Sequence, residues 1–257
     1  RQVLERYIHM ATREGVCQAV FLEGGLSRDG HIRPPRFGLV DYMLRSFDPD
    51  KDRDIVFIPV GINYDRTIED RSLLRNLDPD RKKRSAWFVI KTTFGFIIRN
   101  FAQMAVGKWR RFGYASVNFG RPISVKQYCE ANEVKFDEAD STHRFEQVKK
   151  LADTIMGHIA AVIPILPIAL ISEVLLENKN IWKSELDLKS QALQKIELLR
   201  KKGAPIDISS GASEGVLNNA LTMLVGRRLV DVEENLIRPK EEALVLLEYY
   251  ANSIKQW

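Results

Sequence analysis

The stretch that decides the fold is FLEGGLSRDG, residues 21–30, which continues an apolar run that begins at residue 16. An apolar run that ends in Glu-Gly-Gly predicts a strand followed by a tight turn. Glycine lets the backbone of such a turn approach a ligand closely and leaves N–H groups free. The arginine that follows adds a planar cation that can hold phosphate oxygens with two donors. A plain Gly-Gly turn with a salt-bridged Glu23 fits the same spacing, so both interpretations stay open.

Outward from this turn, β-rich runs alternate with helical patterns. The runs, each bounded by glycine, proline or charged residues, are 16–22, 54–62 and 114–119. Apolar residues at helical spacing predict helices at 3–15, 37–47, 66–77, 81–106, 124–130 and 145–163, with Ser124 as an N-cap. Strands that alternate with helices are typical of α/β layers, so we predict an α/β fold for the first part of the chain.

After about residue 167 the pattern becomes mainly helical. The predicted helices span 170–176, 184–202, 213–226 and 240–254. Two short runs before the last helix, 229–232 and 235–238, predict a small β-hairpin. This change of pattern predicts two domains, residues 1–160 and residues 161–257.

The composition fits a folded chain whose contact with membranes is peripheral. Of the 257 residues, 45% are hydrophobic and 28% are charged. Cys17 and Cys129 form no CxxC pattern and have no histidine cluster beside them, so neither a disulfide framework nor a metal site is predicted. The longest apolar run, 159–171, contains two prolines and is shorter than the roughly 20 residues that cross a bilayer.

A basic and aromatic segment, residues 81–111, carries nine lysines and arginines and no acidic residue. Trp87, Phe94 and Phe101 recur in it at intervals of seven, as in one apolar helix stripe. Charge attracts anionic headgroups and aromatic rings enter the interface, so the segment predicts a lipid-binding surface. The alternative is a core-packed helix with a solvated positive face.

Five motifs occur in one order along the chain: FLEGGLSRDG, PPRFGLVDYML, IVFIPVGINYDR, NFGRPIS and EYYANSIKQW. The first three resemble the third and fourth motifs, with their surroundings, of the glycerolipid acyltransferase family. The last two are similar to a later strand and turn and to the closing helix of its bacterial membrane-bound glycerol-3-phosphate acyltransferase branch. The resemblance covers nearly the whole chain.

This resemblance implies acyl transfer from acyl-CoA or acyl-carrier protein to the 1-hydroxyl of glycerol 3-phosphate, which gives lysophosphatidate. It implies no cofactor, and it places the protein peripherally on the cytoplasmic face of the cell membrane, against anionic lipid. Residues 1–160 would be the C-terminal part of the acyltransferase α/β domain, and residues 161–257 a helical C-terminal domain.

The family's base is a histidine in a His-x-x-x-x-Asp motif, which takes the proton of the attacking hydroxyl. None of the four histidines of this sequence has an aspartate at that spacing. His9 has Glu14 there, but it lies too close to the FLEGG run, so we interpret it as an ordinary helix residue. The chain begins at Arg1. We therefore expect the catalytic histidine upstream of this chain, and no turnover by the chain alone.

The resemblance implies which residues bind the substrate, and Pro59 is one of them. Glu23, Gly24, Gly25, Ser27 and Arg28 stand at motif positions that the family associates with glycerol 3-phosphate.

Two further positions bear on this assignment of substrate-binding residues. Many relatives have an arginine where this chain has Leu26, so Arg28 or Arg33 would have to supply that charge. Pro59 stands at the defining proline of the next motif, and it also has a structural interpretation. A proline removes a ladder donor and therefore favours an edge or the end of a strand.

Six polar residues follow the run 54–62: Tyr64, Asp65, Arg66, Glu69, Asp70 and Arg71. Ligands gather at strand ends in open α/β sheets, which makes the group a candidate site. A solvated, salt-bridged helix start is the alternative, and it accounts for most of these residues.

Three other functions remain as alternatives. The acceptor could be lysophosphatidate or another glycerolipid, or the chain could bind lipid without catalysis. Residues 213–238, with Arg227 and Arg228, could form a winged helix that binds DNA. Five acidic residues lie where the phosphates would be, so we predict no nucleic-acid partner: Asp231, Glu233, Glu234, Glu241 and Glu242.

Overall fold

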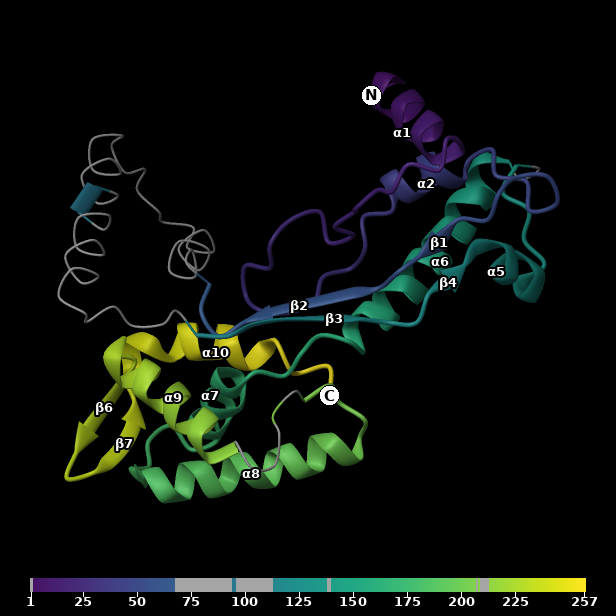
Figure 1. Ribbon diagram of the computed structural model, residues 1–257. Coiled ribbons are helices and arrows are strands. Elements are labelled where there is room, and N and C mark those ends of the chain that lie inside the picture. Colours follow the sequence, from purple (N-terminus) through teal and green to yellow (C-terminus); the bar gives the residue numbers. More distant parts are fainter. Residues whose placement is uncertain (1, 68–93, 96–112, 138–139, 207, 209–212) are drawn as a thin grey trace.

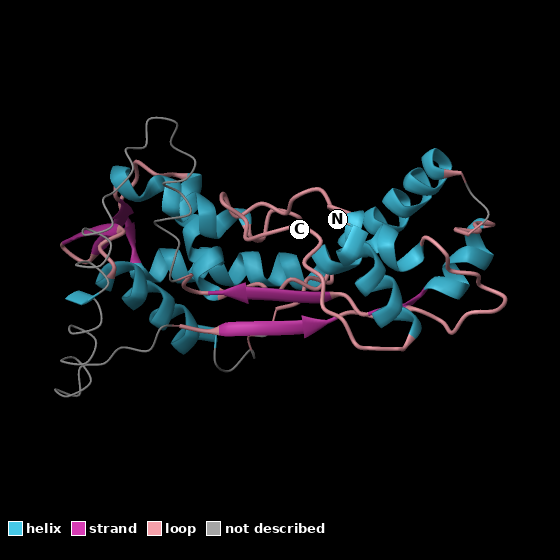
Figure 2. Cartoon of the chain, turned by 90° about the horizontal axis from the view of Figure 1, so that it is seen from above, coloured by secondary structure: helices cyan, strands magenta, loops and turns pink. Residues whose placement is uncertain are grey.

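The computed structural model describes residues 2–67, 94–95, 113–137, 140–206, 208 and 213–257. Two groups of helices lie at the ends of a long two-stranded ribbon formed by β2 and β3 (Figure 1). The view from above shows the same ribbon running between the two groups (Figure 2). The described residues thus form a mixed α/β fold.

The first group consists of α1 (Gln2–Arg13), α2 (Gly38–Leu44), α5 (Val125–Asn132) and α6 (Ser141–Ala160). Their apolar faces form one core, in which Val40, Leu44, Phe136, Val148 and Leu151 are fully buried. The predicted N-cap is confirmed, because the Ser124 hydroxyl accepts a hydrogen bond from the Gln127 N–H at 3.1 Å. One face of α1 has no partner among the described residues and exposes Val3, Leu4, Tyr7 and Met10.

The ribbon joins antiparallel strands from distant parts of the chain. β2 (Val60–Tyr64) pairs with β3 (Ala115–Phe119), and β1 (Val56–Phe57) pairs with β4 (Ile123–Ser124). The predicted strand 54–62 is therefore split in two. The split falls at Pro59, which has no N–H to donate, while its carbonyl accepts from the Gly120 N–H at 2.8 Å.

The predicted strand 16–22 is not a strand in the structure, which assigns residues 16–21 no regular secondary structure. A strand needs a neighbour to bond its backbone groups. Within the described residues this segment has one such cross-link, from the Arg36 N–H to the Leu22 carbonyl at 2.7 Å.

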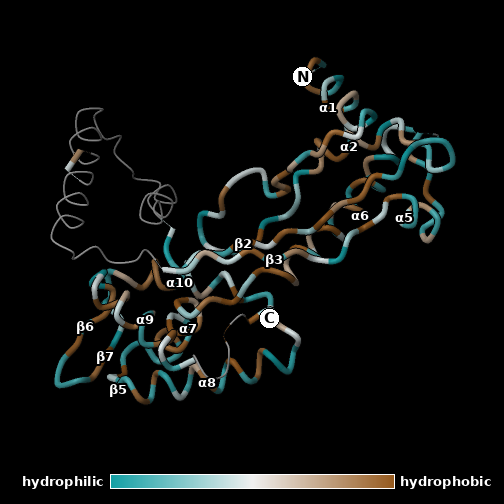
Figure 3. The backbone as a smooth tube through the Cα atoms, viewed as in Figure 1, coloured by the Kyte–Doolittle hydropathy of each residue, from teal (hydrophilic) through white to brown (hydrophobic). Residues whose placement is uncertain are grey.

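The second group is built around α7 (Pro167–Glu177), which is buried along nearly its whole length and is strongly apolar (Figure 3). Around it lie α8 (Glu185–Lys201), α9 (Ser213–Gly226) and α10 (Leu244–Asn252), the last preceded by the short 3₁₀ helix η1 (Glu241–Ala243). The predicted hairpin is confirmed by β6 (Val230–Glu233) and β7 (Leu236–Pro239). β5 (Lys183–Ser184) adds a third strand beside β7.

Both ends of α7 are held by charged side chains from outside the helix. At its start, the Ile168 N–H donates to Oδ1 of Asp65 at 3.3 Å. Near its end, Nζ of Lys183 donates to the Val174 carbonyl at 2.6 Å. These signs match the helix dipole, which favours negative charge at the N-terminus and positive charge at the C-terminus.

The hydrophobic cores divide along the chain. One core draws on residues between 8 and 159, and two others draw on residues between 165 and 257. This separation supports our proposal of a domain division near residue 160. The predicted helices 66–77 and 81–106, and the basic and aromatic segment 81–111, lie almost wholly outside the described residues. Among the helices that the structure describes, none has the length and apolarity to cross a bilayer.

Candidate functional site

Five of the six predicted substrate-binding residues, all except Pro59, lie together on one loop, residues 23–33, between α1 and α2 (Figure 1). A tight turn opens it, in which the Gly24 N–H donates to the Phe21 carbonyl at 2.9 Å. Gly24 has a φ of +70°, and a Cβ there would lie 2.6 Å from Cδ of Arg36. Glycine is needed at this position because side chains disfavour left-handed backbone.

Glu23 closes the loop across its base. Its Oε2 accepts a hydrogen bond from the Arg33 N–H at 3.2 Å. Burial raises the pKa of Glu23, although the hydrogen bond from Arg33 and the charge of Arg33 act in the opposite direction. Glu23 thus joins the two ends of the loop by a hydrogen bond.

Ser27 and Asp29 order the tip of the loop. The Gly30 N–H donates to the Ser27 hydroxyl at 2.9 Å, and that hydroxyl lies 2.9 Å from the His31 carbonyl, to which it can donate. The His31 N–H donates to Oδ1 of Asp29 at 3.1 Å. Partial burial of Asp29 is outweighed by the hydrogen bonds from His31 and Ser27, which lower its pKa. Asp29 is a structural residue that our prediction missed, although Asp-Gly is a recognised turn signal.

One cationic side chain of the loop remains available to a ligand. Arg28 is exposed and makes no hydrogen bond or ion pair with any residue that the structure describes. Arg33 lies on the same loop, Arg36 follows it before α2, and Leu26 is 62% exposed. The two residues predicted to replace the missing motif arginine, Arg28 and Arg33, therefore share the loop with the other acceptor residues.

Pro59 lies elsewhere, in the break between β1 and β2. It is buried, and it packs closely on Gly120, where an added Cβ would lie 3.1 Å from Cβ of Pro59. These contacts agree with the structural interpretation of Pro59 as a strand end.

In the polar group after β2, Asp65 is the buried member, at 1% exposure. Its Oδ2 accepts from the Tyr114 N–H at 3.1 Å, and its Oδ1 accepts from Ile168 at the start of α7. Within the described residues it has no cationic partner, and burial raises its pKa. Asp65 therefore caps a helix instead of lying in a solvated ion pair. Glu69, Asp70 and Arg71 lie outside the described residues.

His9 is engaged with Ser46 and not with Glu14. Its Nδ1 lies 3.1 Å from the Ser46 hydroxyl, and both residues line a hollow of about 380 Å³. Arg45, which also lines the hollow, is already paired with Glu5 and Asp41. In the part of the chain that the structure describes, no group of three or more His, Cys, Asp or Glu could hold a metal ion.

The C-terminal group has the element order of a winged helix, the DNA-binding alternative raised by the sequence. α7, β5, α8, α9 and the hairpin follow one another, and β7 lies between β5 and β6. However, α9 contains no lysine or arginine, and the hairpin carries Glu233 at the end of β6 and Glu234 in its turn. The Arg227 guanidinium donates to the Tyr250 hydroxyl at 2.7 Å. Because DNA affinity depends on cations at phosphates, this surface argues against a nucleic-acid partner.

Comparison of the chain with known proteins finds a matching family and several related proteins. Residues 101–256 match the family described as the glycerol-3-phosphate acyltransferase C-terminal region. Proteins named glycerol-3-phosphate acyltransferase from Pseudomonas syringae pv. tomato and Pseudomonas entomophila are each 27% identical to the chain, over 265 and 260 residues. Each alignment covers 98% of this chain and 30% of the relative. The chain thus spans about 30% of the length of these curated relatives.

Proposed function

Because the chain belongs to the glycerol-3-phosphate acyltransferase C-terminal region family, we propose that it binds the acyl acceptor of a glycerol-3-phosphate 1-O-acyltransferase. The reaction moves a fatty acyl group from acyl-CoA or acyl-carrier protein to glycerol 3-phosphate and gives lysophosphatidate. The loop itself lies outside residues 101–256. The assignment of the loop is supported by the relatives, whose alignments cover 98% of the chain.

The observation that carries the proposed site is Arg28, an exposed cation that pairs with none of the described residues and lies on the same loop as a tight glycine turn. A phosphate dianion needs charged donors, and guanidinium groups bind it through paired N–H···O bonds. Arg33 adds positive charge on the same loop, and Arg36 adds it just after the loop. Glu23 and Ser27 hold the loop in shape by their hydrogen bonds.

The chain supplies acceptor binding and no proton transfer in this proposal. In the reaction, the acceptor hydroxyl oxygen bonds to the thioester carbonyl carbon, the carbon–sulfur bond breaks, and the hydroxyl proton passes to a general base. In the family that base is the histidine of a His-x-x-x-x-Asp motif, which this sequence lacks. We therefore expect the chain alone to bind glycerol 3-phosphate without turning it over.

We further propose a peripheral position on the cytoplasmic face of the membrane. The acyl product is a membrane lipid, and the basic and aromatic segment 81–111 has the composition of a surface that binds anionic lipid. In this arrangement residues 1–160 complete an α/β acyltransferase domain, and residues 161–257 form its helical neighbour.

Calorimetric titration of the chain with glycerol 3-phosphate tests the site. Losing a hydrogen bond to a charged group costs about 1.5–3 kcal/mol, so Arg28→Ala should weaken binding roughly 10- to 100-fold. Lys149→Ala, which also removes an exposed cation but on α6, is the matched control and should leave the affinity unchanged. Glycerol, which lacks the phosphate, should not bind.

Equal affinity of wild type and the Glu23→Ala/Arg28→Ala double variant would rule out this loop as the phosphate site. Lysophosphatidate, the alternative acceptor, carries the same phosphate. A clear preference for it in competition titrations would assign the chain to the next acylation step.

A further inference from the structure

We propose that the C-terminal helix α10 positions the acceptor loop, with Asn252 as the positioning residue. This inference rests on the proposed function, because it concerns how the same loop is set to bind phosphate. It assigns a role to a residue at the opposite end of the chain, which does not itself touch the substrate.

The first observation is a direct hydrogen bond between helix and loop. Nδ2 of Asn252 donates to the backbone carbonyl of Asp29 at 2.8 Å, across 223 residues of sequence. The loop runs along the ribbon to α10, so the contact lies at the far tip of the loop (Figure 1).

The second observation is the close approach of Gly30 to the same helix. Gly30 has a φ of +86°, and a Cβ there would lie 2.0 Å from the Tyr249 carbonyl oxygen and 3.1 Å from Cβ of Asn252. Backbone and helix are thus in van der Waals contact, with no room for a side chain. The loop tip is seated on the last turn of α10.

Helix α10 is itself held in place by contacts with the rest of the structure. Leu247, Tyr250 and Ala251 of α10 are buried in the C-terminal group, where the helix packs on α7. Just after the helix, the Ser253 hydroxyl accepts from Nδ2 of Asn63 at 3.3 Å, and the same amide donates to the Pro164 carbonyl at 2.9 Å. α10 therefore has fixed contacts with both the ribbon and the C-terminal core.

The position of the tip is passed on to the candidate phosphate ligands. Asp29 and Gly30 follow Arg28 directly, and the Gly30 N–H bonds the Ser27 hydroxyl. Holding Asp29 against α10 fixes the residue that follows Arg28. Holding Gly30 there also fixes Ser27, the residue before Arg28, through the bond between the Gly30 N–H and the Ser27 hydroxyl. A loop ordered before binding loses less entropy when it binds, which raises affinity. In this way the C-terminal region contributes to acceptor affinity without contacting the acceptor.

Asn252→Asp tests this role, because a carboxylate has nearly the same shape as the amide but cannot donate to the Asp29 carbonyl. Asn132→Asp is the matched control: Nδ2 of Asn132 also donates to a backbone carbonyl, that of Tyr128 at 2.8 Å, but on α5. Asn252→Gln, which keeps an amide donor, is the conservative variant, and circular dichroism checks that each variant folds.

Two readouts separate positioning from simple stability. Hydrogen exchange reports the Gly30 and His31 amides, and calorimetry reports the Kd for glycerol 3-phosphate. For Asn252→Asp we expect exchange at both amides at least tenfold faster and Kd about tenfold higher. Asn252→Gln should lie between this variant and wild type, and Asn132→Asp should match wild type in both readouts.

Other outcomes would overturn the inference in distinguishable ways. Unchanged exchange at Gly30 and His31 in Asn252→Asp and Asn252→Gln would show that α10 does not hold the loop. Faster exchange with an unchanged Kd would show that the contact is merely structural. If wild type binds no glycerol 3-phosphate, the proposed function fails, while the exchange data still decide whether helix and loop are coupled.

Discussion

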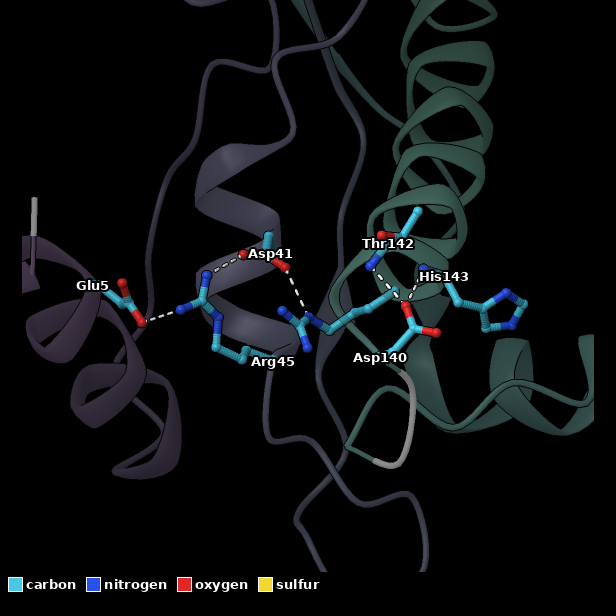
Figure 4. Close-up of polar contacts among 7 residues, drawn as sticks. Glu5, Asp41, Arg45, Asp140, Thr142 and His143 are labelled. Carbon is cyan, nitrogen blue, oxygen red and sulfur yellow. Dashed lines mark hydrogen bonds and ion pairs between the residues drawn. The ribbon is translucent and has the colours of Figure 1, made fainter.

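Arg144 in α6 donates its Nε–H to Oδ1 of Asp41 in α2 at 3.2 Å, and Asp41 is only 1% exposed. Arg45 donates to the other carboxylate oxygen at 2.6 Å and also pairs with Glu5 of α1 (Figure 4). One buried carboxylate is therefore shared by two guanidinium groups. Through these pairs it joins α1 and α2, the helices before and after the acceptor loop, to α6.

Asp41→Ala should lower the free energy of unfolding by about 3 kcal/mol, because removing one partner of a buried pair leaves charge without compensation. Urea denaturation followed by circular dichroism measures the change. Asp153→Ala, which breaks the exposed Lys149–Asp153 pair on α6, should cost less than about 0.5 kcal/mol. Similar losses for the two variants would contradict a buried network at Asp41.

Asp65 should make stability depend on pH. Burial raises its pKa above the ordinary value of 3.8, despite the N–H donors of Tyr114 and Ile168. Such a group stabilises the fold fully below its unfolded pKa, and this contribution is lost as pH rises through the folded pKa. The free energy of unfolding of wild type, relative to Asp65→Asn, should therefore fall as pH rises from 3.8 through the raised value. Urea titrations at several pH values check this, and parallel curves for the two proteins would exclude it.

Gly24→Ala should destabilise the fold by about 1–2 kcal/mol, the cost of a left-handed backbone for a residue with a side chain. The side chain of Arg36 can move away from the new methyl group, so the backbone sets the cost. Gly157→Ala is the matched change at an exposed position inside α6, where it should instead stabilise by roughly 0.5–1 kcal/mol. Thermal unfolding of both variants should show opposite signs; the same sign would refute the strained turn at Gly24.

Local signals in the sequence predicted the local parts of this structure. Helix α9 begins and ends at the predicted residues, 213 and 226, and Ser124 caps α5 as its type and position indicated. The hairpin of β6 and β7 follows from two β-rich runs around a short turn. The glycine turn at Gly24 was also predicted, because a positive φ leaves a direct trace in residue type.

The long-range contacts that hold the candidate site in place have no such signal in the sequence. The bond from Asn252 to Asp29 spans 223 residues, and the cap from Asp65 to Ile168 spans 103. No sequence pattern indicates which distant backbone group an asparagine or aspartate side chain will bond. The expected strand at 16–22 was wrong for a related reason, since strand formation depends on a neighbouring strand and not on the apolar run alone. The lipid-binding segment 81–111 stays a prediction.

The capping of α7 also bears on how the chain unfolds. The acidic cap is Asp65, the residue directly after β2. The central helix of the C-terminal core is therefore completed by a residue on the N-terminal side of the proposed domain boundary. Residues 161–257 on their own would begin this helix with the Ile168 N–H lacking that partner. The two halves should therefore melt as one cooperative unit, with a single heat-capacity peak, and neither half should keep its full stability when separated from the other.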